Sequence, residues 1–567
     1  MNDQQISEAV TRVLSSFGGA SAAPAVPAPV KNKAVARNTP AEDQVASLVS
    51  QILGESKSGR SKAKPDYVPS PTKCGWERAQ KGAACDDAMV SDVIARVLSE
   101  SVGTVSSTPT KPASSCVSID VSDAEATELG DGVFATMDEA VEAAAAAQRQ
   151  YLFCSMEERQ SFVDGIREVI LQPQTLDRIS HMGAEQTGMG KYEHKIIKNR
   201  LAAEKTPGTE DLTTEACSGD GGLTLVEYSA YGVIGSITPT TNPTETIICN
   251  SIGMLAAGNS VVYSPHPRAR VVSLLTIKLI NRKLATLGAP ANLITTVQEP
   301  SIDNTNAMMQ HPKIRMLVAT GGPGIVKTVM STGKKAIGAG AGNPPVVVDE
   351  TADIEKAAVD IINGCSFDNN LPCIAEKEIV AVNQIADYLI SCMTKYGAYL
   401  VEDPAVVKKL EALVINDKGG PQTSCVGKSA VYLLDKVGIK VGDDIKVILI
   451  DLPKDHVFVQ EELMMPILPL VRVPDVDEAI DFAVEVEHGN RHTAMMHSTN
   501  VRKLTKMAKL IQTTIFVKNG PSYAGIGVGG EGYTTFTIAG PTGEGLTGPK
   551  AFARKRRCVM VESLNVR

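Results

Sequence analysis

The sequence has 567 residues, of which 43% are hydrophobic and 21% are charged, and this length predicts two or three folded domains once any tails are set aside. The net charge of −8 argues against a general nucleic-acid-binding protein, and no apolar run reaches the length of a transmembrane helix. Eleven cysteines occur without a CxxC pair, which argues against a zinc ribbon or a dithiol redox motif and, with the polar N-terminus, indicates a cytoplasmic protein.

Residues 1–117 are expected to form a disordered tail that carries three short amphipathic helices. Ala/Pro-rich and Lys/Ser/Pro-rich stretches separate three segments that align without gaps, ISEAVTRVLSS, VASLVSQILGE and VSDVIARVLSE. Their apolar residues recur at helical spacing and predict helices at about residues 5–17, 44–55 and 89–101. Each helix is too short to be stable alone in water, so its apolar face needs a partner, either the chain's own folded part or another protein.

From about Ser118 the composition and periodicity become those of an α/β protein. Helices are predicted at Met137–Arg149, Met156–Leu171 (with Ser155 as N-cap), Pro243–Ala256 and Arg270–Leu287. Strands are predicted at Val233–Ile237, Ser260–Tyr263, Leu293–Val297 and Arg315–Ala319. Strands that alternate with helices in this way are typical of a parallel, doubly wound sheet.

The segment Leu317–Met330, LVATGGPGIVKTVM, is predicted to form a strand, a glycine turn and a helix. Gly321, Gly322 and Gly324 would let the backbone approach a ligand closely, and the N-terminus of the following helix would suit a phosphate group. The segment is not a GxGxxG fingerprint, and glycines in such turns also occur for steric reasons alone. A nucleotide-binding turn and a plain connecting turn therefore both stay open at this point.

Cys373 is the candidate nucleophile of the sequence. It follows the turn Asn369–Pro372, and Pro372 excludes the middle of a regular helix. We therefore expect the thiol at a corner between a loop and a following helix, whose dipole would favour the thiolate. The alternative is a buried structural cysteine, an interpretation that suits Cys365 in its apolar run.

His488 and His492 form the closest approach to a metal-binding pair, because they are four residues apart. Gly489 and Asn490 between them weaken any helix, and no carboxylate is spaced to complete the site. Both histidines are therefore expected to lie in a loop, and no metal site is predicted.

Five sequence blocks occur in the order in which aldehyde dehydrogenases carry their functional motifs. They are YGVIGSITPTTNPTET, MLAAGNSVVYSPHP, ATGGPG, NNLPCIAEKE and EELMMPILPL, which begin at Tyr231, Met254, Ala319, Asn369 and Glu461. From about Ser118 onward the chain therefore resembles the aldehyde dehydrogenase superfamily, and most closely the CoA-acylating members of propanediol and ethanolamine utilisation. The tail resembles the encapsulation peptides of bacterial microcompartment enzymes, which implies that its helices bind a shell protein of a microcompartment in the cytoplasm.

The resemblance implies a role for each matching residue. Cys373 would be the nucleophile, Asn242 would donate to the oxyanion together with the backbone N–H of Cys373, and Glu462 would hold the nicotinamide ribose. The other cofactor-binding residues that it implies are Thr238, Pro239, Ser264, His266, Pro267, Gly321, Gly322 and Gly324. Asn242 as a plain turn residue and Glu462 as a solvated loop acid are the alternatives.

Two positions depart from the pattern of the hydrolytic members. Ser264 stands where many of them have a lysine, so the adenosine ribose must be held differently and the choice between NAD and NADP stays open. The run Gly338–Pro345, GAGAGNPP, stands where they carry the glutamate that activates water, and the glutamate position falls on or near Gly338. Without that carboxylate water is a poor acceptor, whereas a thiol is a better nucleophile, and the glycines leave room for it.

The implied fold is a Rossmann-type NAD-binding domain at 118–345, an α/β catalytic domain at 346–535 and an oligomerisation segment at 536–567. The last segment contains the basic run Arg554–Arg557, which leads into a predicted strand at Cys558–Val561. We interpret the basic run as a strand end or an oligomer contact in a homodimer or homotetramer.

The implied function is the oxidation of a short-chain aldehyde, with propionaldehyde favoured over acetaldehyde, to acyl-CoA. NAD and coenzyme A would take part, and the reaction would pass through a thioester on the cysteine. A CoA-independent, hydrolytic aldehyde or semialdehyde dehydrogenase is one alternative, and a non-catalytic shell adaptor is another.

Overall fold

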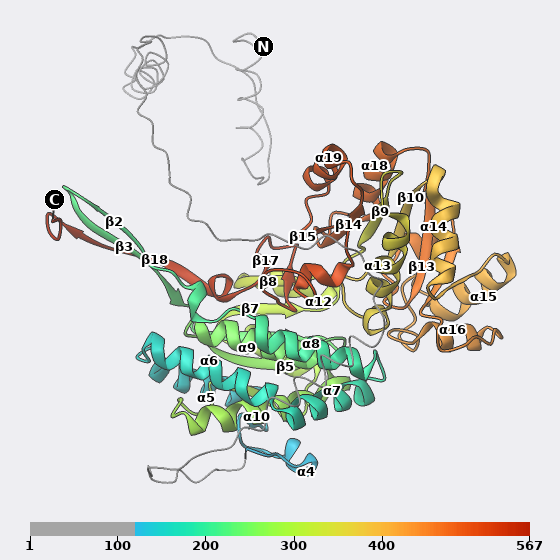
Figure 1. Ribbon diagram of the computed structural model, residues 1–567. Helices are drawn as coiled ribbons and strands as arrows, with labels where there is room; N and C mark the ends of the chain where they lie inside the picture. The colour runs from blue at the N-terminus through green and yellow to red at the C-terminus, as the bar shows by residue number, and fades with distance from the viewer. Residues whose placement is uncertain (1–118, 567) are drawn as a thin grey trace, which may run out of the picture. The chain divides into compact units, whose positions relative to one another are not determined.

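The structure, a computed structural model, describes residues 119–566, which lie within one compact unit of the chain (Figure 1). Two parallel β-sheets organise this unit, one built from strands between residues 133 and 339 and the other from strands between residues 345 and 518. The three helices predicted in the tail lie outside the described residues. Within residues 119–566, no helix is both long and apolar enough to cross a membrane.

The first sheet has six parallel strands in the order β1-β6-β5-β4-β7-β8. They are β1 (Val133–Phe134), β4 (Val233–Thr238), β5 (Ser260–Pro265), β6 (Ile294–Val297), β7 (Ile314–Thr320) and β8 (Lys335–Ala339). Successive residues point to opposite faces, so Val261 and Tyr263 join one core and Val262 joins the other. Both faces of this sheet are therefore covered, as expected for parallel strands.

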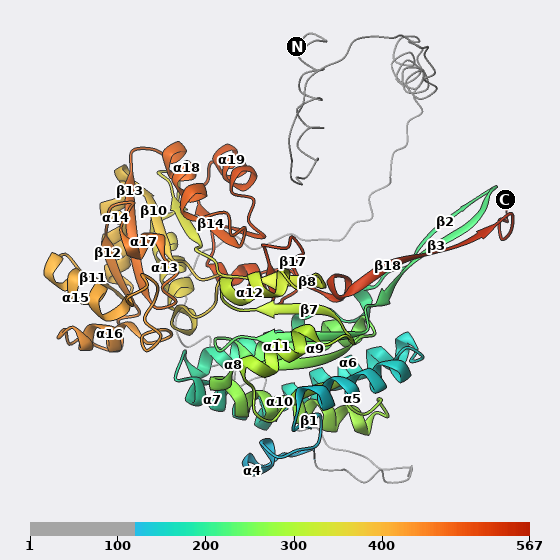
Figure 2. The same cartoon turned by 180° about the vertical axis from the view of Figure 1, so that it is seen from behind.

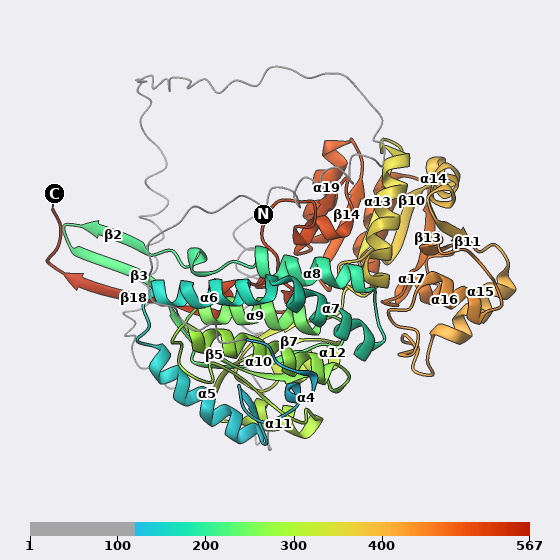
Figure 3. The ribbon, with the colours of Figure 1, turned by 60° about the horizontal axis from the view of Figure 1, so that its bottom comes forward.

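Two groups of helices cover the first sheet. On the face of Val261 lie α6 (Met156–Leu171), α9 (Pro243–Ala256) and α10 (Arg270–Thr286), with α7 (Pro173–Thr187) and α8 (Tyr192–Lys205) beyond them. On the face of Val262 lie α5 (Met137–Tyr151), α11 (Ile302–Gln310) and α12 (Pro323–Met330). The helices α6, α8 and α9 run side by side (Figure 3). The short α4 (Asp123–Ala126) precedes them in the chain.

The second sheet has seven parallel strands in the order β11-β12-β13-β10-β9-β14-β15. They are β9 (Pro345–Val348), β10 (Glu378–Val382), β11 (Ala398–Leu400), β12 (Val447–Asp451), β13 (Ile467–Val473), β14 (Thr493–His497) and β15 (Ile515–Lys518). Around them lie α13 (Ile354–Ser366), α14 (Asn383–Lys395), α15 (Pro404–Val414), α16 (Ala430–Lys436), α17 (Val457–Gln460), α18 (Val476–Val486) and α19 (Val501–Ile511). The pairs α13/α14 and α18/α19 pack on opposite faces.

A three-stranded antiparallel arm extends away from the two sheets, as Figures 1 and 2 both show. It consists of β2 (Glu215–Gly219), β3 (Gly222–Ala230) and β18 (Ala553–Val561), in the order β18-β3-β2. The predicted strand Cys558–Val561 is confirmed, but it begins five residues earlier because the basic run pairs with β3 as well. A small antiparallel pair, β16 (Ile538–Ala539) and β17 (Gly545–Leu546), precedes it in the chain.

The helices and strands predicted in the first half of the α/β region are confirmed, with ends that differ by at most two residues. Ser155 is the N-cap of α6 and accepts a hydrogen bond from the backbone N–H of Glu158. The helix expected directly after Cys373 is wrong. Residues Pro372–Ala375 form a turn, closed by a 3.0 Å hydrogen bond from Ala375 N to Pro372 O, and strand β10 follows.

Candidate active site

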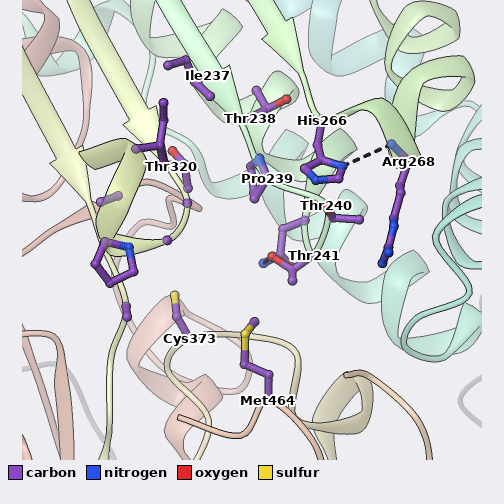
Figure 4. A pocket seen from close by; sticks show the side chains of 18 of the residues that line it. Ile237, Thr238, Pro239, Thr240, Thr241, His266, Arg268, Thr320, Cys373 and Met464 are labelled. Carbon is purple, nitrogen blue, oxygen red and sulfur yellow. Dashed lines mark hydrogen bonds between the residues drawn. The ribbon is translucent and has the colours of Figure 1, made fainter. Parts of the chain in front are cut away.

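A cavity of about 820 Å³ lies where the carboxyl ends of first-sheet strands meet the amino ends of second-sheet strands. From the first sheet it receives the ends of β4, β5, β7 and β8, and from the second the residues that precede β10, β13 and β14. Figure 4 shows Thr238 and His266 on one side of it and Cys373 and Met464 on the other. Both sheets are therefore needed to build this site.

Most of the residues predicted for the site line this cavity. They are Cys373, Asn242, Thr238, Pro239, Ser264, His266, Pro267, Gly321, Gly322 and Glu462. Gly324, the second residue of α12, does not line it.

The first-sheet side of the cavity lies at the point where the strand order reverses. From β4 the chain continues to β5 and β6 on one side and then returns to β7 on the other side of β4. Open α/β sheets bind nucleotides at such a point. Gly322 is the N-cap of α12, and no side chain caps the first turn, so the backbone N–H groups there are available to a phosphate.

Among the buried polar atoms of the cavity that have no hydrogen-bond partner in the described residues are the hydroxyl oxygen of Thr238 and the Oε1 atom of Glu462. A hydroxyl and a carboxylate are the groups that bind ribose hydroxyls, so these residues fit a nicotinamide dinucleotide. The hydroxyl of Ser264, one of the expected cofactor-binding residues, lies 2.8 Å from the hydroxyl of Thr305. This contact satisfies the serine hydroxyl within the protein itself.

The turn before Cys373 has an unusual backbone. Asp368, Asn369 and Asn370 have φ angles of +49°, +55° and +64°, a left-handed region in which Asp and Asn are tolerated better than most residues. Side-chain hydrogen bonds hold the turn in place, because Asn369 donates to Gly427 O at 2.9 Å and Asn370 donates to Cys365 O at 2.9 Å. The position of the nucleophile thus depends on the side chains that precede it.

The surroundings of Cys373 do not favour the thiolate in the way that the sequence suggested. Burial and the nearby carboxylate of Glu462 raise the pKa of the Cys373 thiol to about 12, although the ammonium of Lys377 opposes them. No helix begins at this residue, so no helix dipole acts on the thiol. The thiol must therefore lose its proton to a base when it reacts.

Asn242 is the N-cap residue of α9 and is 7% exposed. Its Oδ1 atom accepts a hydrogen bond of 2.6 Å from Nζ of Lys198, and its Nδ2 atom lies 3.3 Å from the hydroxyl of Thr241. Asn242 and Cys373 both line the cavity, one from each side of it. An amide N–H in this place can donate to an oxygen on a substrate carbon that Cys373 attacks.

His492 is a cavity residue that sequence reasoning missed. It lies outside helices and strands, as expected, but it is only 1% exposed, and its Nε2 atom has no partner among the described residues. A Cβ on Gly342 would lie 2.9 Å from the His492 ring and 3.0 Å from Cys373 O, so this glycine lets the two approach. Burial and the charge of Lys377 lower the pKa of His492 to about 4, which keeps the imidazole neutral at physiological pH.

The glycine run contributes to the cavity in a different way from the one expected. Gly338 lies within β8, where a Cβ would come within 2.6 Å of Val326, and it does not line the cavity. The residues that do are Ala339, Gly340 and Ala341, which carry no ionisable group. Among the described residues, no group of three or more His, Cys, Asp or Glu side chains is arranged to hold a metal ion.

Comparisons with known proteins show which family and which relatives this chain is similar to. Residues 112–411 match the model of the aldehyde dehydrogenase family. A propanal dehydrogenase (CoA-propanoylating) of Salmonella typhimurium is 48% identical over 476 residues, which cover 84% of this chain and 98% of that protein.

Two solved structures are similar as well. The propionaldehyde dehydrogenase of Rhodopseudomonas palustris, with bound CoA and an acylated cysteine, has a TM-score of 0.76 and 75% identity and covers 77% of this chain and all of that one. A propionaldehyde dehydrogenase from the fucose utilisation microcompartment of Clostridium phytofermentans has a TM-score of 0.75 and 53% identity, with the same coverage of both chains.

Proposed function

The chain belongs to the aldehyde dehydrogenase family, and on that premise we propose that it oxidises a short-chain aldehyde to acyl-CoA, using a nicotinamide dinucleotide and coenzyme A. One observation carries the proposal. The cavity joins a cysteine, an amide donor and a neutral buried histidine, and neither Gly338 nor its neighbours Ala339–Ala341 supplies a carboxylate for activating water. The similarity to CoA-propanoylating relatives supports it.

In the first half-reaction, Sγ of Cys373 attacks the aldehyde carbon and the carbonyl π electrons move to the oxygen. The Nδ2–H of Asn242 and the backbone N–H of Cys373 donate to this oxyanion, a contribution of the order of 10²–10³ in rate for each donor. The unpartnered Nε2 of His492 accepts the thiol proton and passes it to solvent. When bound, the dinucleotide supplies the hydride acceptor, and the product is a thioester on Cys373.

In the second half-reaction, the thiol of CoA attacks the thioester carbon. Nε2 of His492 takes the proton of the CoA thiol, and the same two donors stabilise the second oxyanion. When the tetrahedral species collapses, the C–S bond to Cys373 breaks and acyl-CoA leaves. His492 then returns its proton to the Cys373 thiolate, which restores the starting state.

Propionaldehyde is the substrate that we propose, because the three relatives above are all named for the three-carbon aldehyde. Acetaldehyde differs by one methylene group, which is worth about 1–3 kcal/mol of discrimination. Activity towards both, with a preference for propionaldehyde, is the expected pattern.

The tail and the arm suggest partners. We propose that the three repeated helices bind a microcompartment shell protein, which the occurrence of one relative in such a compartment supports. We also propose that the enzyme is a homodimer or homotetramer that pairs through the arm, because β18 lies at the edge of its sheet and most of its residues are exposed.

The test of this proposal measures NADH formation from propionaldehyde and NAD⁺, with and without CoA. Wild-type enzyme should turn over steadily only with CoA, and Cys373→Ala should show no turnover. Cys392→Ala, a buried cysteine on α14, serves as the matched control and should remain active. Steady turnover without CoA would favour the hydrolytic alternative, and a wild-type protein without dehydrogenase activity would favour the shell adaptor.

A further inference from the structure

A fully buried lysine, Lys198 on α8, lies behind the oxyanion donor. Its ammonium is 2.6 Å from Oδ1 of Asn242, 2.9 Å from Oε1 of Glu245 and 2.6 Å from Oδ2 of Asp368. Of these three acceptors, Asn242 receives a hydrogen bond from the lysine, and the two carboxylates form ion pairs with it. The lysine side chain and the two carboxylates are at most 1% exposed.

The three acceptors come from the two sides of the active site. Asn242 and Glu245 belong to the first turn of α9, whereas Asp368 belongs to the left-handed turn that precedes Cys373. Asp368 is itself held by the backbone N–H of Lys191 at 2.7 Å. Lys198 therefore connects the residue that binds the oxyanion to the turn that carries the nucleophile.

The contact also decides which way the amide of Asn242 points. A lysine ammonium can only donate, so the amide must turn its oxygen towards Lys198 and its NH₂ group away from it. If Lys198 were absent, the amide could rotate and place Oδ1 where the N–H donor stands now. An oxygen lone pair there would repel an oxyanion instead of stabilising it.

We propose that Lys198 is a positioning residue of the oxyanion hole, which orients the amide of Asn242 and fixes its distance from the turn of Cys373. The inference rests on the proposed acyl-transfer function. Lys198 stays protonated, because the carboxylates of Asp368 and Glu245 outweigh the effect of burial and raise the pKa of its ammonium. The ammonium groups of Lys195 and Lys198 lower the pKa of Asp368 by more than burial raises it, so this carboxylate stays ionised.

Lys195 provides a matched comparison within the same cluster. It lies one turn earlier on α8, is 2% exposed, and its ammonium is 3.4 Å from Asp368. Among the described residues its one ion pair is with Asp368, and Asn242 is bonded by Lys198 instead. Loss of Lys195 should thus disturb the buried charges without freeing the amide.

The experiment compares two variants of equal charge, Lys198→Met/Glu245→Gln and Lys195→Met/Glu245→Gln. Each removes one positive and one negative charge, so neither leaves a net buried charge behind. Measurements are the first-turnover rate of NADH formation, the rate of CoA attack on the acylated enzyme, and the KM for NAD⁺. The Lys198→Met/Glu245→Gln variant should slow both steps about 10- to 100-fold, which is less than the complete loss of an oxyanion donor would cause. Its KM for NAD⁺ should be unchanged. The Lys195 pair should stay close to the wild-type rates.

A double-mutant cycle with Asn242→Ala separates positioning from a structural effect. If Lys198 acts through the amide, adding the Lys198 pair to Asn242→Ala should cause no further loss of rate. Equal losses in the two pairs, or losses that multiply fully with Asn242→Ala, would overturn the inference. Failure of the proposed function would be visible separately, as a lack of CoA-dependent turnover in the wild type.

Lys198→Arg is the variant to measure if Lys198→Met/Glu245→Gln does not fold. It keeps the buried positive charge and a donor for Oδ1, so a folded Lys198→Arg enzyme should be faster than Asn242→Ala. A folded Lys198→Arg enzyme as slow as Asn242→Ala would contradict the proposal.

Discussion

The thiol of Cys373 and the carboxylate of Glu462 share one cavity, and the charge of the carboxylate disfavours the thiolate. Burial raises the pKa of Glu462 to about 7, and its charge in turn contributes to the raised pKa of the thiol. The ligand-free enzyme should therefore hold Cys373 as a thiol at neutral pH, with a thiolate fraction that rises about tenfold per pH unit.

This leads to a prediction for alkylation of Cys373 by iodoacetamide in the absence of ligands. The rate should rise from pH 6 to pH 9 without a plateau, because the pKa of about 12 lies above this range. The rise should be shallower near pH 7, where Glu462 becomes charged and disfavours the thiolate. Glu462→Gln should react faster than the wild type at pH 8, whereas Glu461→Gln, its exposed neighbour, should not. Mass spectrometry of the Cys373 peptide measures these rates, and a plateau near pH 8 would contradict the prediction.

His492 leads to a second prediction, for the CoA-dependent step. His492→Gln should slow the attack of CoA on the acylated enzyme about 10²–10⁴-fold, the usual contribution of a general base. Because the pKa of His492 is lowered to about 4, the imidazole is neutral above pH 5, and the wild-type step should not fall as pH drops from 8 to 6 on account of this residue. Stopped-flow thiolysis measures the rate.

The control for this prediction is His488→Gln. His488 is exposed and its Nε2 atom lies 3.0 Å from Gln460 O, away from the lining of the cavity. Comparable rates in the two variants would remove His492 from the mechanism.

At the scale of elements, the turn before Cys373 depends on a close approach of Gly190. A Cβ at Gly190 would lie 2.1 Å from Oδ1 of Asp368, and this residue has φ +80°. Gly190→Ala should therefore displace Asp368, break its bond to the backbone N–H of Lys191, and lower kcat as well as the melting temperature.

Gly188→Ala is the comparison that isolates backbone strain. Gly188 has φ +64°, and the nearest atom to its Cβ would be the flexible Nζ of Lys428 at 3.5 Å. Each alanine should cost about 1–2 kcal/mol for its left-handed conformation, but only Gly190→Ala should reduce kcat. Thermal unfolding and steady-state kinetics together decide this, and equal kcat values would show that Asp368 tolerates the shift.

The helices and strands around the first sheet could be predicted from the sequence, because the capping residues, prolines and glycines at their ends favour the conformations that the fold requires. Pro243 at the first helical position, Ser155 as a cap, and apolar runs between glycines mark the element ends, and these ends are where the structure has them. The helix predicted after Cys373 failed for a physical reason. Residues 378–382 are buried on both faces as β10, and pairing with β9 and β13 decides their conformation, which local propensity does not report.

Site residues that lie in a recognisable sequence block could be predicted. A residue that reaches the cavity only through its place at the edge of a sheet, such as His492, was missed. His492 precedes β14 in the same way that Cys373 precedes β10, so both lie at the amino edge of the second sheet. Only the strand order brings the two edges together, and no spacing in the sequence encodes that order. The division into domains at residues 345 and 535, and the roles assigned to the site residues, stay predictions.

At the scale of the whole molecule, the tail and the folded unit should be separable. Deletion of residues 1–117 should leave kcat and KM unchanged, because the cavity is built from residues 189–538 alone. The same deletion should abolish co-purification with assembled shells in a host that makes them. Single copies of the helix should bind less tightly than all three, since linked sites raise the effective concentration.

Kinetic parameters and the fraction of enzyme recovered with shells are the two measurements, each compared with a full-length chain in which the three helices are scrambled. A truncated enzyme that still enters shells would place the targeting signal in the folded unit.

The pairing of β18 with β3 has a consequence for the order of synthesis. Lys555 and Glu215 form a 2.8 Å ion pair across the arm although they are 340 residues apart, and Asn259 donates to Phe552 O at 2.9 Å across a similar interval. At ribosomal rates of about 5–20 residues per second, β3 leaves the ribosome roughly 17 to 70 s before its neighbour is made. During that time β3 carries an open strand edge, so a premature stop before residue 553 would release a chain whose arm lacks β18 and not merely a shortened enzyme.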